Sequence, residues 1–109
     1  MIIKELLSPL QAELLTGNAD IQVRGCYVGD LLSDVLASAQ TDVLWITIQI
    51  HRNVVSVASM KDISAVLITR GRKLDPQTLA EAEESGVTVF TTPLNSYEAA
   101  GKLWEAGLR

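Results

Sequence analysis

The sequence predicts an α/β domain in which helices cover both faces of a mostly parallel sheet of four to five strands. Three observations predict this class. Short apolar stretches rich in β-forming residues alternate with stretches of helical periodicity. Helix-start signals and glycines separate the stretches, and no repeat, low-complexity tract or linker interrupts them. The length of 109 residues is typical of one domain, which we expect to span 1–109.

The first part of the chain is predicted to form a short helix and two strands. Ile2–Leu10 carries apolar residues at helical spacing. Ala12–Leu15 is a short apolar stretch that ends at a glycine turn, which predicts a strand. Ile21–Val28 alternates between apolar and polar residues and is rich in β-formers. Gly25 within it indicates a weak point or a bulge.

Two strand–helix transitions are expected in the middle of the chain. Asp30 is predicted to cap a helix whose apolar residues repeat at helical spacing as far as Ala39. Val43–Ile50 is the clearest strand. The valines of Asn53–Lys61 favour a strand by propensity, whereas their spacing and the need for a crossover favour a helix. We predict the helix.

The next unit has the strongest boundary signals. Ala65–Thr69 is predicted to be a buried strand. Asp75 and Pro76 form a typical helix start, because the carboxylate can cap the first turn and proline lacks only an N–H that would be free anyway. Gly86 is expected to end this helix in the left-handed conformation.

The last unit is a strand followed by a helix. Val87–Phe90 is the expected strand. Asn95 and Glu98 have the spacing of a capping box at the start of the final helix. Gly107 lies just past the expected end of that helix. Alternating strands and helices of this kind predict right-handed crossovers between parallel strands.

The amino-acid composition indicates the cellular compartment of the protein and disfavours some classes of binding partner. Nine basic and thirteen acidic residues give a net charge of −4, which disfavours binding to nucleic acid or to a membrane surface. Cys26 is the only cysteine, so no intramolecular disulfide forms, which fits the cytoplasm. Its apolar strand predicts a buried structural thiol.

The residues of known catalytic and metal sites are mostly missing. His51 is the only histidine, and with one cysteine it cannot supply a typical zinc site. Neither a phosphate-binding loop nor a nucleophile motif is present. We therefore expect no metal, no cofactor and no catalytic activity. An enzyme acting through His51 and Asp30 is the least favoured alternative.

Polar residues follow each of the predicted parallel strands. Ligands of open α/β sheets bind beyond the carboxyl ends of the strands, so we expect these residues to share one rim. The predicted ligand-binding residues are Gly29, Asp30, Thr47, Gln49, His51, Thr69, Arg70, Gly71, Thr91 and Thr92.

A basic cluster precedes the helix that starts at Asp75. Arg70, Arg72 and Lys73 lie beside the expected helix N-terminus, where backbone N–H groups and the helix dipole favour an anion. Arg70 is suited to grip phosphate or carboxylate with two hydrogen bonds. The other interpretation is an ordinary strand-to-helix turn with solvated charges and a glycine at positive φ. The spacing of these residues does not decide between the anion site and the ordinary turn.

The second half of the chain resembles the N-terminal domain of HPr kinase/phosphorylase over residues 65–98. The residues that carry this resemblance are Val66-Leu67-Ile68-Thr69-Arg70-Gly71, Pro76, Leu79, Ala82-Glu83, Gly86-Val87, Val89, Thr92-Pro93-Leu94 and Glu98. With the stretches 27–34 and 53–62, the whole chain resembles a stand-alone DRTGG domain, a family that also occurs in phosphate acetyltransferases and beside CBS domains. Thr69-Arg70-Gly71 is the nearest equivalent of the family's motif.

The resemblance implies a three-layer α/β/α sandwich with a non-catalytic, regulatory role, often as a dimer or within a larger assembly. The kinase half is absent, so phosphotransfer is not expected. Our first hypothesis is a regulatory or sensor module that binds a small anionic ligand such as a nucleotide and signals through association. The alternative is a dimerisation or protein-interaction module without a ligand. Its surface would be formed by the β-rich middle of the chain and by the last helix with its Tyr97, Trp104 and Leu108.

Overall fold

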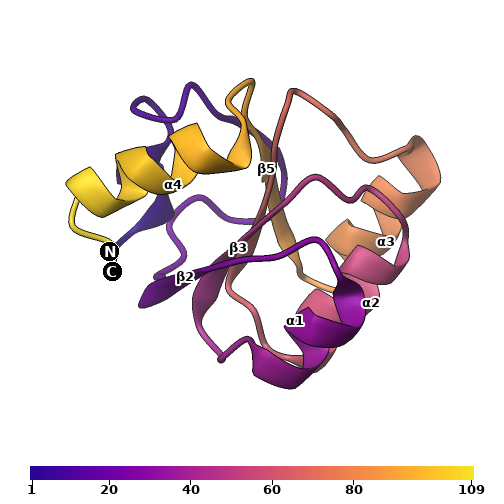
Figure 1. The fold of residues 1–109 in the computed structure, drawn as a ribbon. Helices are drawn as coiled ribbons and strands as arrows, with labels where there is room; N and C mark the ends of the chain where they lie inside the picture. Colours follow the sequence, from indigo (N-terminus) through magenta and orange to yellow (C-terminus); the bar gives the residue numbers. More distant parts are fainter.

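A five-stranded sheet lies between two helical layers in the computed structural model, which describes residues 1–109 (Figure 1). The strand order is β1-β5-β4-β3-β2. Strands β2 to β5 are parallel, and β1 pairs antiparallel with β5. The fold class predicted from the sequence is therefore confirmed. The strands are β1 (Glu13–Thr16), β2 (Gly25–Val28), β3 (Val43–Thr47), β4 (Ala65–Ile68) and β5 (Thr88–Thr91).

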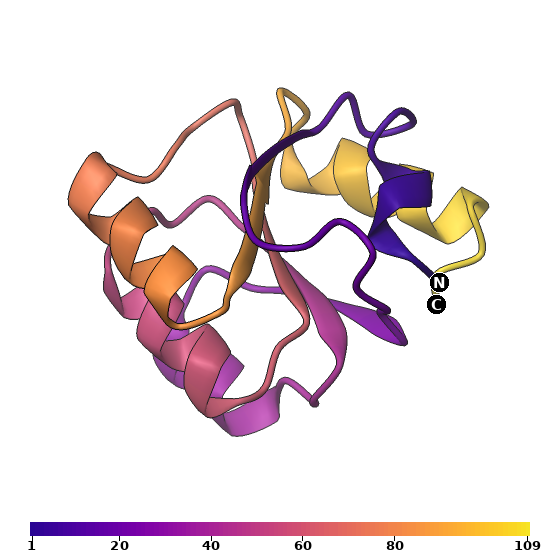
Figure 2. The same cartoon turned by 180° about the vertical axis from the view of Figure 1, so that it is seen from behind.

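The helices divide between the two faces of the sheet. Successive parallel strands are neighbours, so each right-handed crossover places its helix on the same face. That face carries α1 (Leu32–Ser38), α2 (Asn53–Met60) and α3 (Pro76–Glu84), as Figures 1 and 2 show. The other face is covered by α4 (Ser96–Glu105) and by the short 3-10 helix η1 (Ile3–Leu6).

Both faces of the central strands are buried. Trp45 and Val66 pack under the three-helix layer, whereas Leu44 and Phe90 pack under α4 and η1. Every residue of β3, β4 and β5 is buried, as expected for parallel strands covered on both faces. The indole N–H of Trp45 donates to the carbonyl of Gly29 at 2.8 Å, so the largest core side chain also holds the end of β2.

Several predicted elements are shorter in the structure. The strand predicted over Val43–Ile50 ends at Thr47, because the N–H of Ile48 donates to a carboxylate and leaves the ladder. The strand predicted over Ile21–Val28 begins only at Gly25. The helix predicted over Ile2–Leu10 is a single 3-10 turn, η1.

The prediction that Asp30 caps the following helix is wrong. The N-cap of α1 is Leu31, and no side chain caps it. The carboxylate of Asp30 instead accepts hydrogen bonds from the end of β3. This carboxylate therefore joins two neighbouring strands rather than a strand and its own helix.

The other boundary signals are confirmed. Asn53–Met60 is helical, as the spacing predicted against the propensity of its valines. Asp75 caps α3 through the N–H of Thr78. Asn95 and Glu98 form the capping box of α4. No helix of the chain combines the length and apolar character needed to cross a bilayer.

Candidate functional site

The carboxyl ends of the four parallel strands form one rim of the sheet. Thr47 of β3 is in register with Ile68 of β4, which is in register with Thr91 of β5. Val28 of β2 is in register with Ile46. The residues that directly follow these strands therefore lie along the same edge, which is the arrangement on which the predicted site depends.

Asp30 is the centre of a hydrogen-bond network at this rim. One carboxylate oxygen, Oδ1, accepts from the Thr47 hydroxyl and from the N–H of Ile48, both at 2.9 Å. The Gln49 side chain donates to the Asp30 carbonyl at 3.2 Å, and the Gln49 N–H donates to the Thr47 hydroxyl at 3.2 Å. The second oxygen of Asp30 has no partner within the chain. It can accept a hydrogen bond from a ligand.

A guanidinium bonds the same residue as this carboxylate, Ile48. Arg72 reaches back from the loop after β4, and its Nη1 donates to the carbonyl of Ile48 at 2.9 Å. Ile48 therefore bonds Asp30 through its N–H and Arg72 through its carbonyl. Arg70 is exposed and makes no ion pair, whereas Lys73 pairs with Glu13 at 3.4 Å. The rim thus offers one carboxylate and two exposed guanidinium groups.

The backbone of the loop after β4 is already bonded within the protein. Arg70 and Gly71 adopt consecutive left-handed conformations, with φ of 64° and 68°. Their N–H groups donate to the carbonyls of Leu94 at 2.9 Å and Thr92 at 2.7 Å. These N–H groups are therefore not free to bind an anion.

The N-terminus of α3 already carries an anion of its own. The carboxylate of Asp75 accepts from the N–H of Thr78 at 2.8 Å. This hydrogen bond lowers the pKa of Asp75, so the carboxylate stays ionised. An anionic ligand would meet like charge at this helix start, so the side chains of Arg70 and Arg72 are the remaining anion-binding groups.

The four predicted threonines lie inside the rim, and the hydroxyls of three of them bond its strand ends and loops. Thr47, Thr69, Thr91 and Thr92 are all buried. The Thr91 hydroxyl donates to the carbonyl of Arg72 at 2.6 Å, and the Thr92 hydroxyl donates to the carbonyl of Leu10 at 2.5 Å. These residues position the exposed groups of the rim, and their direct contact with a ligand stays a prediction.

His51 lies apart from the Asp30 network. Its Nδ1 accepts from the N–H of Asn53 at 3.1 Å. It lines a polar hollow of about 170 Å³ between the starts of α2 and α3, together with Arg52, Asp75, Gln77, Thr78 and Glu81. Arg52 and Glu81 form an ion pair of 2.9 Å there. No hydrogen bond joins His51 to Asp30, the pair considered for catalysis.

The rim is an open ledge rather than a cleft. Of the ten predicted residues, only His51 lines any of the five cavities in the protein surface. Small-molecule sites usually enclose most of their ligand.

Arg72, which the sequence placed only in a basic cluster, contributes the contact that connects the loop after β4 to the end of β3.

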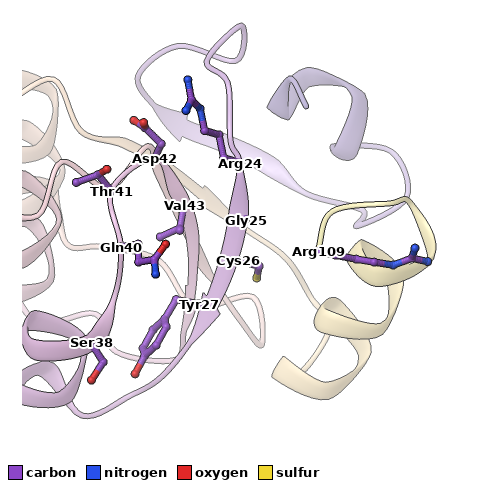
Figure 3. A pocket seen from close by; sticks show the side chains of 10 residues that line it. All are labelled: Arg24, Gly25, Cys26, Tyr27, Ser38, Gln40, Thr41, Asp42, Val43 and Arg109. Atoms are coloured by element: carbon purple, nitrogen blue, oxygen red, sulfur yellow. The ribbon is translucent and has the colours of Figure 1, made fainter.

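A larger hollow lies at the opposite end of the strands and was not predicted. It has a volume of about 450 Å³ and runs beside the first residues of β2 and β3. Figure 3 shows Tyr27 and Ser38 at one end, Arg24 and Asp42 at the other, and Arg109 beyond β2. The polar residues 40–42 line this hollow and directly precede the predicted strand that starts at Val43. They were the only indication of the hollow in the sequence.

Cys26, beside this hollow, is not an activated nucleophile. Burial raises the pKa of its thiol to about 11. The group is therefore protonated at neutral pH, as expected for a structural thiol and not for a reactive one. Its side chain is partly buried, whereas full burial was predicted.

The fold and the rim define a small α/β domain with a polar ledge at the carboxyl ends of its parallel strands. The chain belongs to the DRTGG domain family, whose model matches residues 5–106. The further resemblance to the N-terminal domain of HPr kinase/phosphorylase stays a prediction. Comparison with curated proteins gave no match.

The fold is shared with a solved structure of a regulatory region. That structure contains the CBS and DRTGG domains of Clostridium perfringens pyrophosphatase, complexed with the activator diadenosine tetraphosphate. The TM-score is 0.79 at 16% sequence identity, and the match covers 94% of this chain. The match covers 45% of the solved regulatory-region chain, so the likeness shows the fold of one part of that region.

Proposed function

We propose that this chain is a non-catalytic regulatory module that binds a small anionic ligand of the nucleotide class at the rim. The single observation that carries the proposal is the position of Asp30 and Arg72 on either side of Ile48. A nucleotide has hydroxyl donors on its ribose and anionic oxygens on its phosphate. The free carboxylate oxygen of Asp30 can accept a hydrogen bond from a ribose hydroxyl, and the guanidinium of Arg72 can donate to a phosphate oxygen.

The neighbouring fold supports the same ligand class. The pyrophosphatase regulatory region was solved with a nucleotide activator, diadenosine tetraphosphate. In this chain the exposed groups Asp30, Arg70 and Arg72 and the half-buried Gln49 would contact the ligand, and the buried threonines would hold those groups in place. Because the rim is open, binding to one copy leaves much of the ligand in water. Association with another domain would enclose it and pass the signal on.

Thermal unfolding against a panel of small molecules tests the proposal. The panel contains diadenosine tetraphosphate, ATP, AMP and inorganic phosphate. A ligand present at a hundred times its dissociation constant adds about 2.7 kcal/mol of stability, which raises Tm by about 12 °C for a domain of this size. If no member of the panel raises Tm, the proposed ligand class is wrong.

Variants then locate the site. Arg72→Gln removes an exposed guanidinium and is expected to weaken nucleotide binding by roughly ten- to a hundredfold, the value of one charge-assisted hydrogen bond. Lys4→Gln, on η1, removes the same charge from another part of the surface and serves as the matched control. Equal weakening by both variants would indicate a general charge effect and not a site at the rim.

A second candidate is an interaction module without a small ligand, in which α4 forms the contact surface. The observation that favours it is the exposure of Tyr97 and Trp104 on that helix. The cytoplasmic setting remains a prediction under both candidates.

A further inference from the structure

The hollow at the amino ends of β2 and β3 is lined by four polar side chains that have no partner in the protein. No side-chain hydrogen bond or ion pair with another residue is formed by Arg24, Gln40, Thr41 or Asp42. Their donors and acceptors are therefore available to a ligand. The volume of about 450 Å³ lies within the range of small-molecule sites, roughly 300–1,000 Å³. None of the ten residues predicted for the rim lines this hollow.

Arg24 and Asp42 bring opposite charges to the same end of the hollow (Figure 3). The N–H of Arg24 donates to the carbonyl of Asp42 at 2.8 Å, so the two backbones keep a fixed spacing. The N–H of Asp42 donates in turn to the carbonyl of Asp62 at 3.1 Å. The two side chains nevertheless form no ion pair with each other. The remaining charged side chain of the lining, Arg109, lies beyond β2, with its guanidinium carbon 5.0 Å from the centre of the Trp104 ring.

We propose that this hollow binds a free α-amino acid with a polar side chain. An α-amino acid carries a carboxylate and an ammonium group on one carbon atom. The carboxylate can accept from the guanidinium of Arg24, while the ammonium group donates to the carboxylate of Asp42. A nucleotide has no cation for Asp42, and its phosphates would meet like charge there. The hollow therefore selects a different class of ligand from the rim, and the inference does not depend on the function proposed for the rim.

The rest of the hollow predicts the kind of side chain that the amino acid carries. Gly25 and Val43 are in register in β2 and β3 and lie between the two ends of the hollow, where they form a short apolar floor (Figure 3). At the far end, the hydroxyls of Tyr27 and Ser38 donate to the carboxylate of Asp34 at 2.5 and 3.4 Å. Their oxygens can still accept hydrogen bonds. A short methylene stem that ends in a donor, such as the amide of glutamine, matches this order of groups.

Amide NMR of the labelled whole chain with L-glutamine is the first test. The titration extends to about 10 mM, ten times a millimolar dissociation constant. Saturable shifts are expected at residues 24–25 and 40–43, whereas the signals of the rim residues 47–49 and 69–72 should stay in place. No shifts, or shifts spread equally over both ends of the strands, would overturn the proposal. A failure of the rim to bind nucleotide would leave this result unaffected.

Two analogues test the two charges separately. N-acetyl-L-glutamine lacks the ammonium group, and L-glutaminamide lacks the carboxylate. Each is expected to bind at least about tenfold more weakly than L-glutamine, because each loses one charge-assisted hydrogen bond. If either analogue binds as tightly as L-glutamine, the pairing with Arg24 and Asp42 is wrong.

Variants then locate the site. Gly25→Leu is expected to abolish binding by filling the hollow. A Cβ at Gly25 would lie 3.8 Å from Cγ1 of Val43, an ordinary contact, so urea unfolding should show an intact fold. Arg24→Gln should weaken binding roughly ten- to a hundredfold, whereas Lys4→Gln on η1 is the charge-matched control and should bind as the wild type does. Wild-type affinity in Gly25→Leu or Arg24→Gln, or equal weakening by Lys4→Gln, would contradict the site.

Discussion

Thr47 is the position from which the rim can be disturbed without touching its exposed groups. The residue is fully buried, with 0% of its surface exposed. Its hydroxyl donates to Asp30 at 2.9 Å and accepts from the N–H of Gln49 at 3.2 Å. Thr47→Val keeps the shape of the side chain and removes both hydrogen bonds.

The expected cost follows from the chemistry of the two bonds. A hydrogen bond to a charged group contributes about 1.5–3 kcal/mol, and the Asp30 carboxylate also keeps its bond to Ile48 and its contact with water. We therefore expect Thr47→Val to lower the free energy of unfolding by about 2 kcal/mol, or Tm by about 10 °C. Urea unfolding followed by circular dichroism measures this loss of stability. An unchanged dependence of the free energy of unfolding on urea concentration would show that the variant keeps the same fold.

Two controls make this prediction specific. Thr41→Val changes an exposed threonine before β3 and should alter stability by less than about 0.5 kcal/mol. In a double-mutant cycle with Asp30→Ala, which removes the acceptor, the two sites should show a coupling of about 1 kcal/mol or more, because they share one hydrogen bond. A loss at Thr47 no larger than at Thr41, or additive effects of Thr47→Val and Asp30→Ala, would refute the network.

Three further predictions concern other parts of the chain. Gly17→Ala should lower the free energy of unfolding in urea by about 3 kcal/mol or more. Gly17 has a φ of 100°, and a Cβ there would lie 2.5 Å from the Cα of Thr88. A near-neutral result would contradict this turn. The pKa of Asp75 is lowered by its bond to the N–H of Thr78, so its stabilisation is present above the unfolded pKa and is lost as the pH falls through the folded one. Acid should therefore reduce stability less in Asp75→Asn than in the wild type, and parallel pH profiles would count against the cap. Cys26, with a pKa raised by burial to about 11, should react with a thiol reagent at pH 8 only after unfolding, and rapid reaction of the folded protein would show an accessible thiolate.

Signals between residues that are close in the sequence were sufficient to predict most elements of the fold. Asp75 with Pro76, and Asn95 with Glu98, are cap signals that depend only on neighbouring residues, so the structure confirms them. The helix Asn53–Met60 required the additional argument that parallel neighbouring strands need a crossover. Strand ends were predicted less well, because Ile48 leaves the ladder for a carboxylate that is distant in sequence.

The position of the candidate residues at one rim was predicted, but their contacts were not, and whether they bind a ligand stays a prediction. The parallel strands bring the polar residues to one rim, as their positions after each strand suggested. Which groups stay exposed depends on tertiary partners. The Thr92 hydroxyl, for example, bonds the carbonyl of Leu10, a residue 82 positions away, and no local pattern predicts such a pair.

A titration followed by amide NMR tests the central claim of a nucleotide-class site at the rim most directly. Diadenosine tetraphosphate is added to the labelled protein, and the shift of each N–H signal is recorded. The account predicts saturable shifts at residues 29–30, 47–49 and 69–72, with the signal of Ile48 among the largest because its N–H bonds Asp30. An unchanged spectrum, or shifts confined to Arg24 and Asp42 at the other end of the strands, would contradict it.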